Sequence, residues 1–179
     1  HFRYFWDYSG GVFMDFWCHI TDVAYWAMDL QAPKTVSASG GRYFIEDNTE
    51  TPDSMELLYE YPGDILMNWT LHPKPLAGFS GGIGCVFQGT EAVLVTNYNE
   101  NKIYQDGKIV EDFPWPEESI PNSPGHLREF LNSIKSREQT TCNVEYAYKL
   151  TKGGLMGNIA YRTGDKLVWD DEQERFVNN

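Results

Sequence analysis

Three polar side chains near the start of the chain have the spacing of a site built on one face of a helix. Asp15, His19 and Asp22 stand at positions i, i+4 and i+7. At about 100° per residue, they fall within roughly 60° of one another around a helix axis. Histidine exchanges protons near neutral pH, and a nearby carboxylate fixes its tautomer. This stripe therefore suits general acid–base chemistry.

An amphipathic helix from Gly11 to Leu30 is predicted to position the stripe. The apolar residues expected on its opposite, buried side are Phe13, Trp17, Ile20, Ala24, Ala27 and Met28. Trp26 projects along the polar stripe near His19, as in the wall of a cleft. A merely solvated face is the alternative, although such faces usually carry Lys, Glu and Gln rather than Asp and His. Metal binding is a third, less favoured alternative, because metal motifs with this spacing bring a second histidine.

Extended segments dominate the middle of the chain. The predicted strands are residues 34–44, 55–61, 65–71, 84–88, 92–96, 103–104 and 109–110. Pro62-Gly63-Asp64 and Asp106-Gly107 mark two hairpin turns between them. Strands that are followed by helices predict an α+β domain with an antiparallel or mixed sheet.

Two helices are predicted near the end of the chain. The first runs from Pro124 to Lys135 with Ser123 as its cap, and the second from Glu145 to Thr163, closed by Gly164. The glycines in the second helix suggest close approach of another backbone, either this domain's sheet or another domain; they are Gly153, Gly154 and Gly157. Residues 165–176 are expected to trail along the surface.

Two loops are rich in proline or glycine. Residues 72–82 are expected to be mobile or to cover a ligand, and they lack the pattern of a phosphate-binding loop. Residues 112–124 are expected to connect a hairpin to a helix.

Composition narrows the partners. A formal net charge of −12 repels phosphate backbones and anionic lipids, so nucleic-acid and membrane-surface binding are disfavoured. Neutral substrates fit better, and the many aromatic rings either stack on sugar faces or fill the core. Cys18, Cys85 and Cys142 form neither a zinc motif nor a disulfide framework. A reducing, cytoplasmic location is therefore expected.

The stretch Gly10-Gly11-x-x-x-Asp15-x-x-x-His19-x-x-Asp22 resembles the signature of a family of NAD(P)-dependent sugar and polyol dehydrogenases. This is the glucose-fructose oxidoreductase/inositol dehydrogenase (Gfo/Idh/MocA) family. Residues 126–137 and 157–164 are similar to the family's closing helices, and the resemblance runs from about Trp6 to Phe176. It implies the C-terminal substrate and oligomerisation domain, an open sheet with helices on one face.

Family members begin with a dinucleotide-binding domain that carries a Gly-rich turn and a Glu-Lys-Pro motif with a catalytic lysine. Neither feature occurs in these 179 residues, which open at His1. Residues 1–179 are therefore expected to be one domain of a longer two-domain protein. The resemblance implies NAD or NADP in the parent protein, with no dinucleotide bound by this chain alone.

Hydride transfer needs a base for the hydroxyl proton, and together with the positions on the stripe and the resemblance this need assigns roles to individual residues. His19 would be the base or proton relay, acting with the lysine of the other domain, and Asp15 would orient His19 or hold a substrate hydroxyl. Asp22 would hold a further hydroxyl, and Trp26 and His126 would contact the substrate, although a histidine at position 126 is more often structural. Trp17 departs from the family pattern, which favours a small residue there, and is expected to pack into the core.

Three classes of function stay open at this point. The favoured one is the substrate half of an oxidoreductase acting on a sugar, polyol or related carbohydrate. The second is a glycoside-cleaving enzyme in which NAD oxidises the sugar transiently. The third is a carbohydrate-binding or dimerisation module without catalysis. A homo-oligomer formed through an apolar outer face of the sheet is expected in each case.

Overall fold

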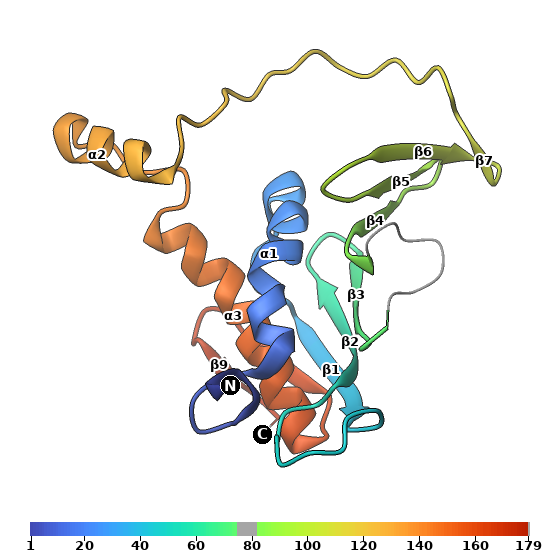
Figure 1. Ribbon diagram of the computed structural model, residues 1–179, viewed down its shortest axis with the longest axis vertical. Coiled ribbons are helices and arrows are strands. Elements are labelled where there is room, and N and C mark those ends of the chain that lie inside the picture. Colours follow the sequence, from blue (N-terminus) through green and yellow to red (C-terminus); the bar gives the residue numbers. More distant parts are fainter. Residues whose placement is uncertain (75–81, 179) are drawn as a thin grey trace.

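The computed structural model describes residues 1–74 and 82–178 (Figure 1). A short 3₁₀ helix at Phe2–Tyr4 precedes the first long helix. The α-helices are α1 (Gly11–Met28), α2 (His126–Ser136) and α3 (Val144–Thr163). The strands are β1 (Thr35–Gly41), β2 (Ser54–Tyr61), β3 (Ile65–Leu71), β4 (Cys85–Gln88), β5 (Val93–Thr96), β6 (Asn101–Gln105), β7 (Lys108–Ile109), β8 (Leu167–Asp170) and β9 (Arg175–Phe176). The predicted helices and hairpins are confirmed, with ends that differ by a few residues.

The strands divide into two sheets in place of the single open sheet that the sequence predicts. The larger sheet has the order β3-β2-β1-β8-β9 and the smaller one the order β4-β5-β6-β7. Every strand pair among the described residues is antiparallel. The α+β class with an antiparallel sheet is thereby confirmed.

The end of the chain does not trail along the surface, and that expectation is wrong. After α3 the chain forms β8, which pairs with β1, and then β9. Leu167 is fully buried against the core. These strands have only four and two residues, so their sequence shows too little alternation to predict them.

Helices α1 and α3 pack together on one face of the larger sheet (Figure 1). The glycines of α3 allow this close approach. A Cβ atom at Gly154 would lie 2.9 Å from the Trp17 ring, and one at Gly157 would lie 2.6 Å from Leu57 Cδ2 of β2. The close approach that the sequence left undecided therefore occurs within this domain: α3 packs against α1 and β1, and its Gly157 meets side chains of β2.

The buried side of α1 differs in part from the predicted one. Phe13 and Trp17 are buried as expected, but Ala27 and Met28 are exposed. Thr21 and Tyr25 take their place, and the Tyr25 hydroxyl shares a 2.9 Å hydrogen bond with Tyr61 of β2. A polar atom at the end of an aromatic ring can be buried when it finds such a partner.

The outer face of the larger sheet is polar, so the predicted apolar face is wrong. Glu56, Asn68 and Thr70 share hydrogen bonds there, and Thr70 Oγ1 donates to Glu56 Oε2 at 2.8 Å. Leu66 is the most exposed apolar side chain on these strands, at 65%. The inner positions Met55, Leu57 and Tyr59 belong to the core instead.

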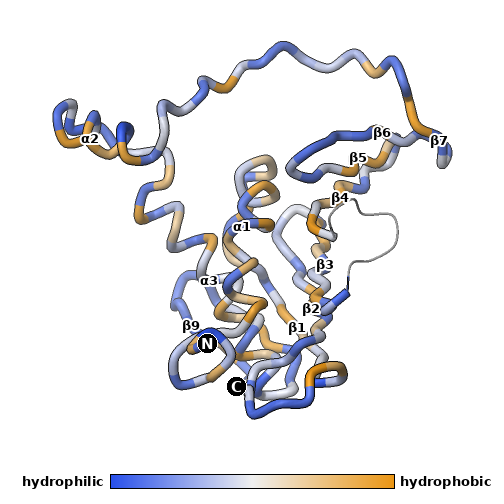
Figure 2. The backbone as a smooth tube through the Cα atoms, viewed as in Figure 1, coloured by the Kyte–Doolittle hydropathy of each residue, from blue (hydrophilic) through white to orange (hydrophobic). Residues whose placement is uncertain are grey.

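Helix α2 projects away from the α1–α3 pair at the end of the long connector that follows β7 (Figure 1). Figure 2 shows apolar positions recurring among polar ones along α2. Gly125, with φ of 98°, is its N-cap, so the predicted Ser123 cap is wrong. Ser123 Oγ instead accepts a hydrogen bond from the Gly125 N–H.

Candidate active site

The Gly10-Gly11 pair lies at the start of α1, the helix that carries the polar stripe. Gly11 has φ of 78°, a left-handed value that L-residues with a side chain rarely adopt. A Cβ atom there would also lie 2.8 Å from Thr51. The Asn158 amide of α3 donates to the Gly10 carbonyl oxygen at 3.1 Å. This glycine pair therefore serves close packing at the first turn of α1.

His19 lies on the outward side of α1 with an exposed side chain. Its imidazole lies 6.2 Å from the Phe16 ring, centroid to centroid. Among the described residues, neither Asp15 nor Asp22 forms a hydrogen bond with the His19 ring. The imidazole is therefore accessible to a bound molecule.

Asp15 forms an ion pair with Arg3, whose Nη2 lies 3.1 Å from Asp15 Oδ2. Both side chains are partly exposed, so the pair adds little stability. On the stripe, one turn before His19, Asp15 therefore presents a carboxylate that is paired with the N–H donors of the Arg3 guanidinium.

Asp22 is held from the neighbouring helix. The Tyr146 hydroxyl of α3 donates to Asp22 Oδ1 at 2.6 Å and lies 3.3 Å from the main-chain oxygen of the same residue. Burial, the hydrogen bond to Asp22 and the charge of that carboxylate raise the pKa of Tyr146. The tyrosine thus stays a donor across the physiological range.

The structure places the two remaining predicted site residues differently. Trp26 is 61% exposed and follows His19 by two turns on the same side of α1. His126 is exposed at the first residue of α2, which projects away from α1 (Figure 1). Asp15, His19, Asp22 and Trp26 therefore share one helix side, and His126 does not join them.

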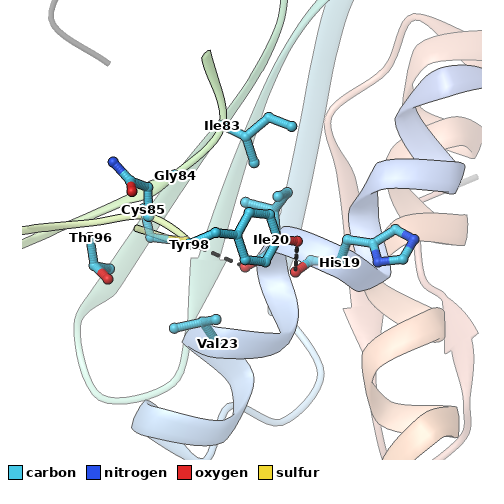
Figure 3. Close-up of a pocket in the computed structure, with 9 residues that line it drawn as sticks. His19, Ile20, Val23, Ile83, Gly84, Cys85, Thr96 and Tyr98 are labelled. Carbon is cyan, nitrogen blue, oxygen red and sulfur yellow. Dashed lines mark hydrogen bonds between the residues drawn. The ribbon is translucent and has the colours of Figure 1, made fainter. Parts of the chain in front are cut away.

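A small pocket of about 70 Å³ lies between α1 and the smaller sheet. Cys85 Sγ donates to the Ile20 carbonyl oxygen at 3.3 Å, and the Tyr98 hydroxyl donates to the His19 carbonyl oxygen at 3.5 Å. Burial raises the pKa of the Cys85 thiol, which keeps it a protonated donor. Figure 3 shows the His19 ring pointing away from this pocket, so the pocket is distinct from the stripe.

Three partners of this region were not predicted: Arg3, Tyr98 and Tyr146. Tyr146 lies 124 residues from Asp22 along the sequence, and Tyr98 lies 79 residues from His19. No local pattern marks contacts over such separations. The polarity of the stripe was the only sequence signal for them.

The described residues contain no group of three or more potential metal-ligating side chains, and no helix among them has the length and apolar character needed to cross a membrane.

Dinucleotide pyrophosphates are received by a parallel strand–turn–helix unit, whereas the strand pairs described for this chain are antiparallel. These residues therefore do not fit a dinucleotide. Most of the 72–82 loop, residues 75–81, lies outside the described part of the chain.

The fold is similar to that of several solved oxidoreductases. The WlbA dehydrogenase from Bordetella pertussis in complex with NADH and UDP-GlcNAcA matches with a TM-score of 0.69 and 13% identity over 94% of this chain and 49% of that one. An oxidoreductase from Agrobacterium radiobacter, in complex with NAD⁺, L-tartaric acid and magnesium, matches with a TM-score of 0.57 and 12% identity over 82% and 46%. An oxidoreductase from Thermotoga maritima matches with a TM-score of 0.57 and 14% identity over 94% and 47%.

The chain thus spans just under half the length of these structures. No curated protein matches it. The family model described as the oxidoreductase family, C-terminal alpha/beta domain, matches residues 1–179. The chain therefore belongs to the Gfo/Idh/MocA oxidoreductase family, as its C-terminal domain.

Proposed function

We propose that this chain is the substrate-binding half of an NAD(P)-dependent oxidoreductase that acts on a sugar, polyol or related carbohydrate. The observation that carries the proposal is the exposed His19 imidazole on the outward side of α1, between the carboxylates of Asp15 and Asp22. The NADH and UDP-sugar in the Bordetella pertussis complex support the same class of chemistry.

Oxidation of a secondary alcohol removes a hydride from carbon and a proton from oxygen. The hydride acceptor, NAD or NADP, would be held by an N-terminal dinucleotide-binding domain, because the described residues do not fit it. This chain's own part is to bind the carbohydrate and to accept the hydroxyl proton. His19 performs the second task, since its ring is accessible and free of hydrogen bonds to the neighbouring carboxylates.

The other stripe residues bind hydroxyl groups. Asp15 and Arg3 together offer an acceptor and several donors, which suits two adjacent hydroxyls. Asp22 keeps further acceptor capacity beside its bond from Tyr146. Trp26 offers an exposed ring face on which a sugar can stack. His126 enters the substrate site only if α2 folds toward it in the complete protein.

The carbohydrate site needs walls beyond these residues. The pocket beside α1 has about 70 Å³, whereas ligand pockets typically have roughly 300–1,000 Å³. The N-terminal domain supplies the opposite wall in this proposal, which makes the reaction site an interface between the two domains.

We place the protein in the cytoplasm, which is consistent with its three unpaired cysteine thiols.

A substrate screen of the full-length protein tests this proposal. Myo-inositol, D-glucose and UDP-N-acetylglucosaminuronic acid are each incubated with NAD⁺ or NADP⁺, and absorbance at the reduced nicotinamide band is followed. Net reduction of the cofactor with at least one of these compounds is expected. In a parallel assay with p-nitrophenyl β-D-glucoside, release of p-nitrophenol without net reduction of the cofactor would replace dehydrogenation by transient oxidation. Binding without either reaction would contradict the enzymatic proposal.

A further inference from the structure

The contact between Tyr146 and Asp22 lies at the short end of the range for hydroxyl hydrogen bonds. The hydroxyl oxygen lies 2.6 Å from Asp22 Oδ1 and 3.3 Å from the Asp22 main-chain oxygen. A hydroxyl carries one hydrogen, and distances of about 2.5–2.7 Å are typical of O–H groups that donate to an ionised carboxylate. The proton therefore goes to the side chain, and the main-chain oxygen is a secondary neighbour.

Tyr146 is held rigidly enough to orient the carboxylate. It lies in the first turn of α3, where its backbone N–H donates to the Asn143 side chain at 3.0 Å as part of the N-cap. One turn further along α3, the Leu150 carbonyl oxygen accepts a 2.7 Å hydrogen bond from the Trp17 indole of α1. Both helices are thus fixed to each other next to the Tyr146–Asp22 contact.

This contact leaves part of the Asp22 carboxylate available. Among the described residues, hydrogen bonds to its side chain reach only Oδ1. A carboxylate accepts about four hydrogen bonds, so Oδ2 and one lone pair of Oδ1 can take substrate hydroxyls. Asp15 is held differently, by a partly exposed ion pair with Arg3. Of the two stripe carboxylates, Asp22 therefore has the firmer orientation.

We infer that Tyr146 is a positioning residue that holds the Asp22 carboxylate in the orientation that binds a carbohydrate hydroxyl. This inference rests on the proposed function. A carboxylate that is already oriented loses less conformational entropy when substrate binds, which strengthens binding without changing the reacting atoms. Tyr146 therefore affects substrate affinity more than turnover.

Kinetics of the full-length protein test the inference with whichever compound of the screen it oxidises. Tyr146→Phe removes one oxygen atom and is expected to raise KM about 3- to 10-fold, the worth of one hydrogen bond. The expected change in kcat is less than about twofold. Tyr148→Phe is the matched control, because it also removes a tyrosine–carboxylate hydrogen bond on α3, to Glu174 at 2.6 Å. It is expected to leave KM unchanged.

A double-mutant cycle separates positioning from a general structural role. Asp22→Ala alone should raise KM, and Tyr146→Phe added to it should raise KM no further, since the carboxylate that accepts the Tyr146 hydrogen bond is gone. If Tyr146→Phe and Tyr148→Phe give the same KM as the wild type, the inference is overturned while the proposed function stands. If the wild-type protein oxidises no compound of the screen, the proposed function itself fails.

A measurement without substrate tests the contact itself. In protein labelled with ¹³C at the tyrosine ring, the Tyr146 signal of the Asp22→Asn variant should begin to titrate at a lower pH than that of the wild type. The reason is that Asp22 contributes to the raised pKa of Tyr146. Equal titration in both proteins would show that the contact does not form in solution and would overturn the inference.

Discussion

The indole Nε1 of Trp17 donates a 2.7 Å hydrogen bond to the main-chain oxygen of Leu150. This bond joins the centre of α1 to α3 inside the core, where Trp17 is fully buried. It fixes the rotation of α1 about its axis, so that the core takes Phe13 and Trp17 while His19 faces outward. The large residue that departs from the family pattern therefore serves packing, as the sequence predicts.

Replacing this indole should destabilise the fold. Trp17→Phe leaves a cavity and removes the hydrogen bond to Leu150, so we expect the free energy of unfolding to fall by about 2–3 kcal/mol. Trp26→Phe is the matched control on the same helix, and its 61% exposure predicts a change within about 0.5 kcal/mol. Urea unfolding of both variants measures the difference. Equal stabilities would contradict the packing role of Trp17.

Acid should weaken the loop that follows β1, through Asp53. Burial acts to raise the pKa of Asp53, but hydrogen bonds from the backbone N–H groups of Tyr43, Phe44 and Ile45 and from the Ser54 hydroxyl outweigh it, and the pKa lies below its ordinary value of 3.8. A carboxyl with a lowered pKa in the folded state stabilises the fold above its unfolded pKa. That contribution disappears as pH falls through the folded value.

Asp53→Asn should therefore lower Tm by roughly 5 °C at pH 7, because the charge-assisted bonds are lost. The difference between variant and wild type should shrink below about pH 4. Thermal melts at pH 7, 5 and 3 measure it. A difference that is constant over this range would show that the Asp53 charge does not matter.

Much of the fold was predictable because its signals are local. The 3.6-residue pattern located α1, and the Pro62-Gly63-Asp64 turn located the β2–β3 hairpin. β8 and β9 were missed because they are too short to show alternation. The outer sheet face was misjudged because alternation in β2 and β3 does not tell which side faces the helices.

The candidate site was predictable only in part for the same reason. The spacing of Asp15, His19 and Asp22 follows from the helix period, so their common side was foreseen. Tyr146 and Arg3, which hold the two carboxylates, come from separate segments brought close by tertiary packing. The roles of these residues in catalysis stay predictions.

Residues 1–179 alone should not bind NAD⁺ or NADP⁺ tightly. The strands described here pair antiparallel, whereas a dinucleotide site needs a parallel strand–turn–helix unit with glycines at the turn. Calorimetric titration of either dinucleotide into this chain should give no binding in the micromolar range. A micromolar Kd would place part of the cofactor site in this domain.

Self-association through the outer face of the larger sheet stays a prediction, and because Glu56, Asn68 and Thr70 make that face polar, its apolar contact would centre on Leu66. Leu66 is its most exposed apolar side chain, so Leu66→Arg should shift the protein toward monomer in analytical ultracentrifugation. Leu155→Arg is the control, because Leu155 is 52% exposed on α3, which packs on the opposite face of the sheet. The sheet interface is contradicted if the wild type stays monomeric, or if both variants associate equally.

The most direct test of the catalytic proposal is the turnover of the full-length His19→Ala protein. A positioned proton acceptor contributes about 10²- to 10⁴-fold, so kcat should fall by that factor while thermal stability changes little, since the ring is exposed. His72→Ala is the matched control: its ring contacts Glu56 at 3.3 Å on the outer side of the sheet, and its kcat should stay within about twofold of the wild type. Wild-type turnover in a folded His19→Ala protein would contradict the assignment.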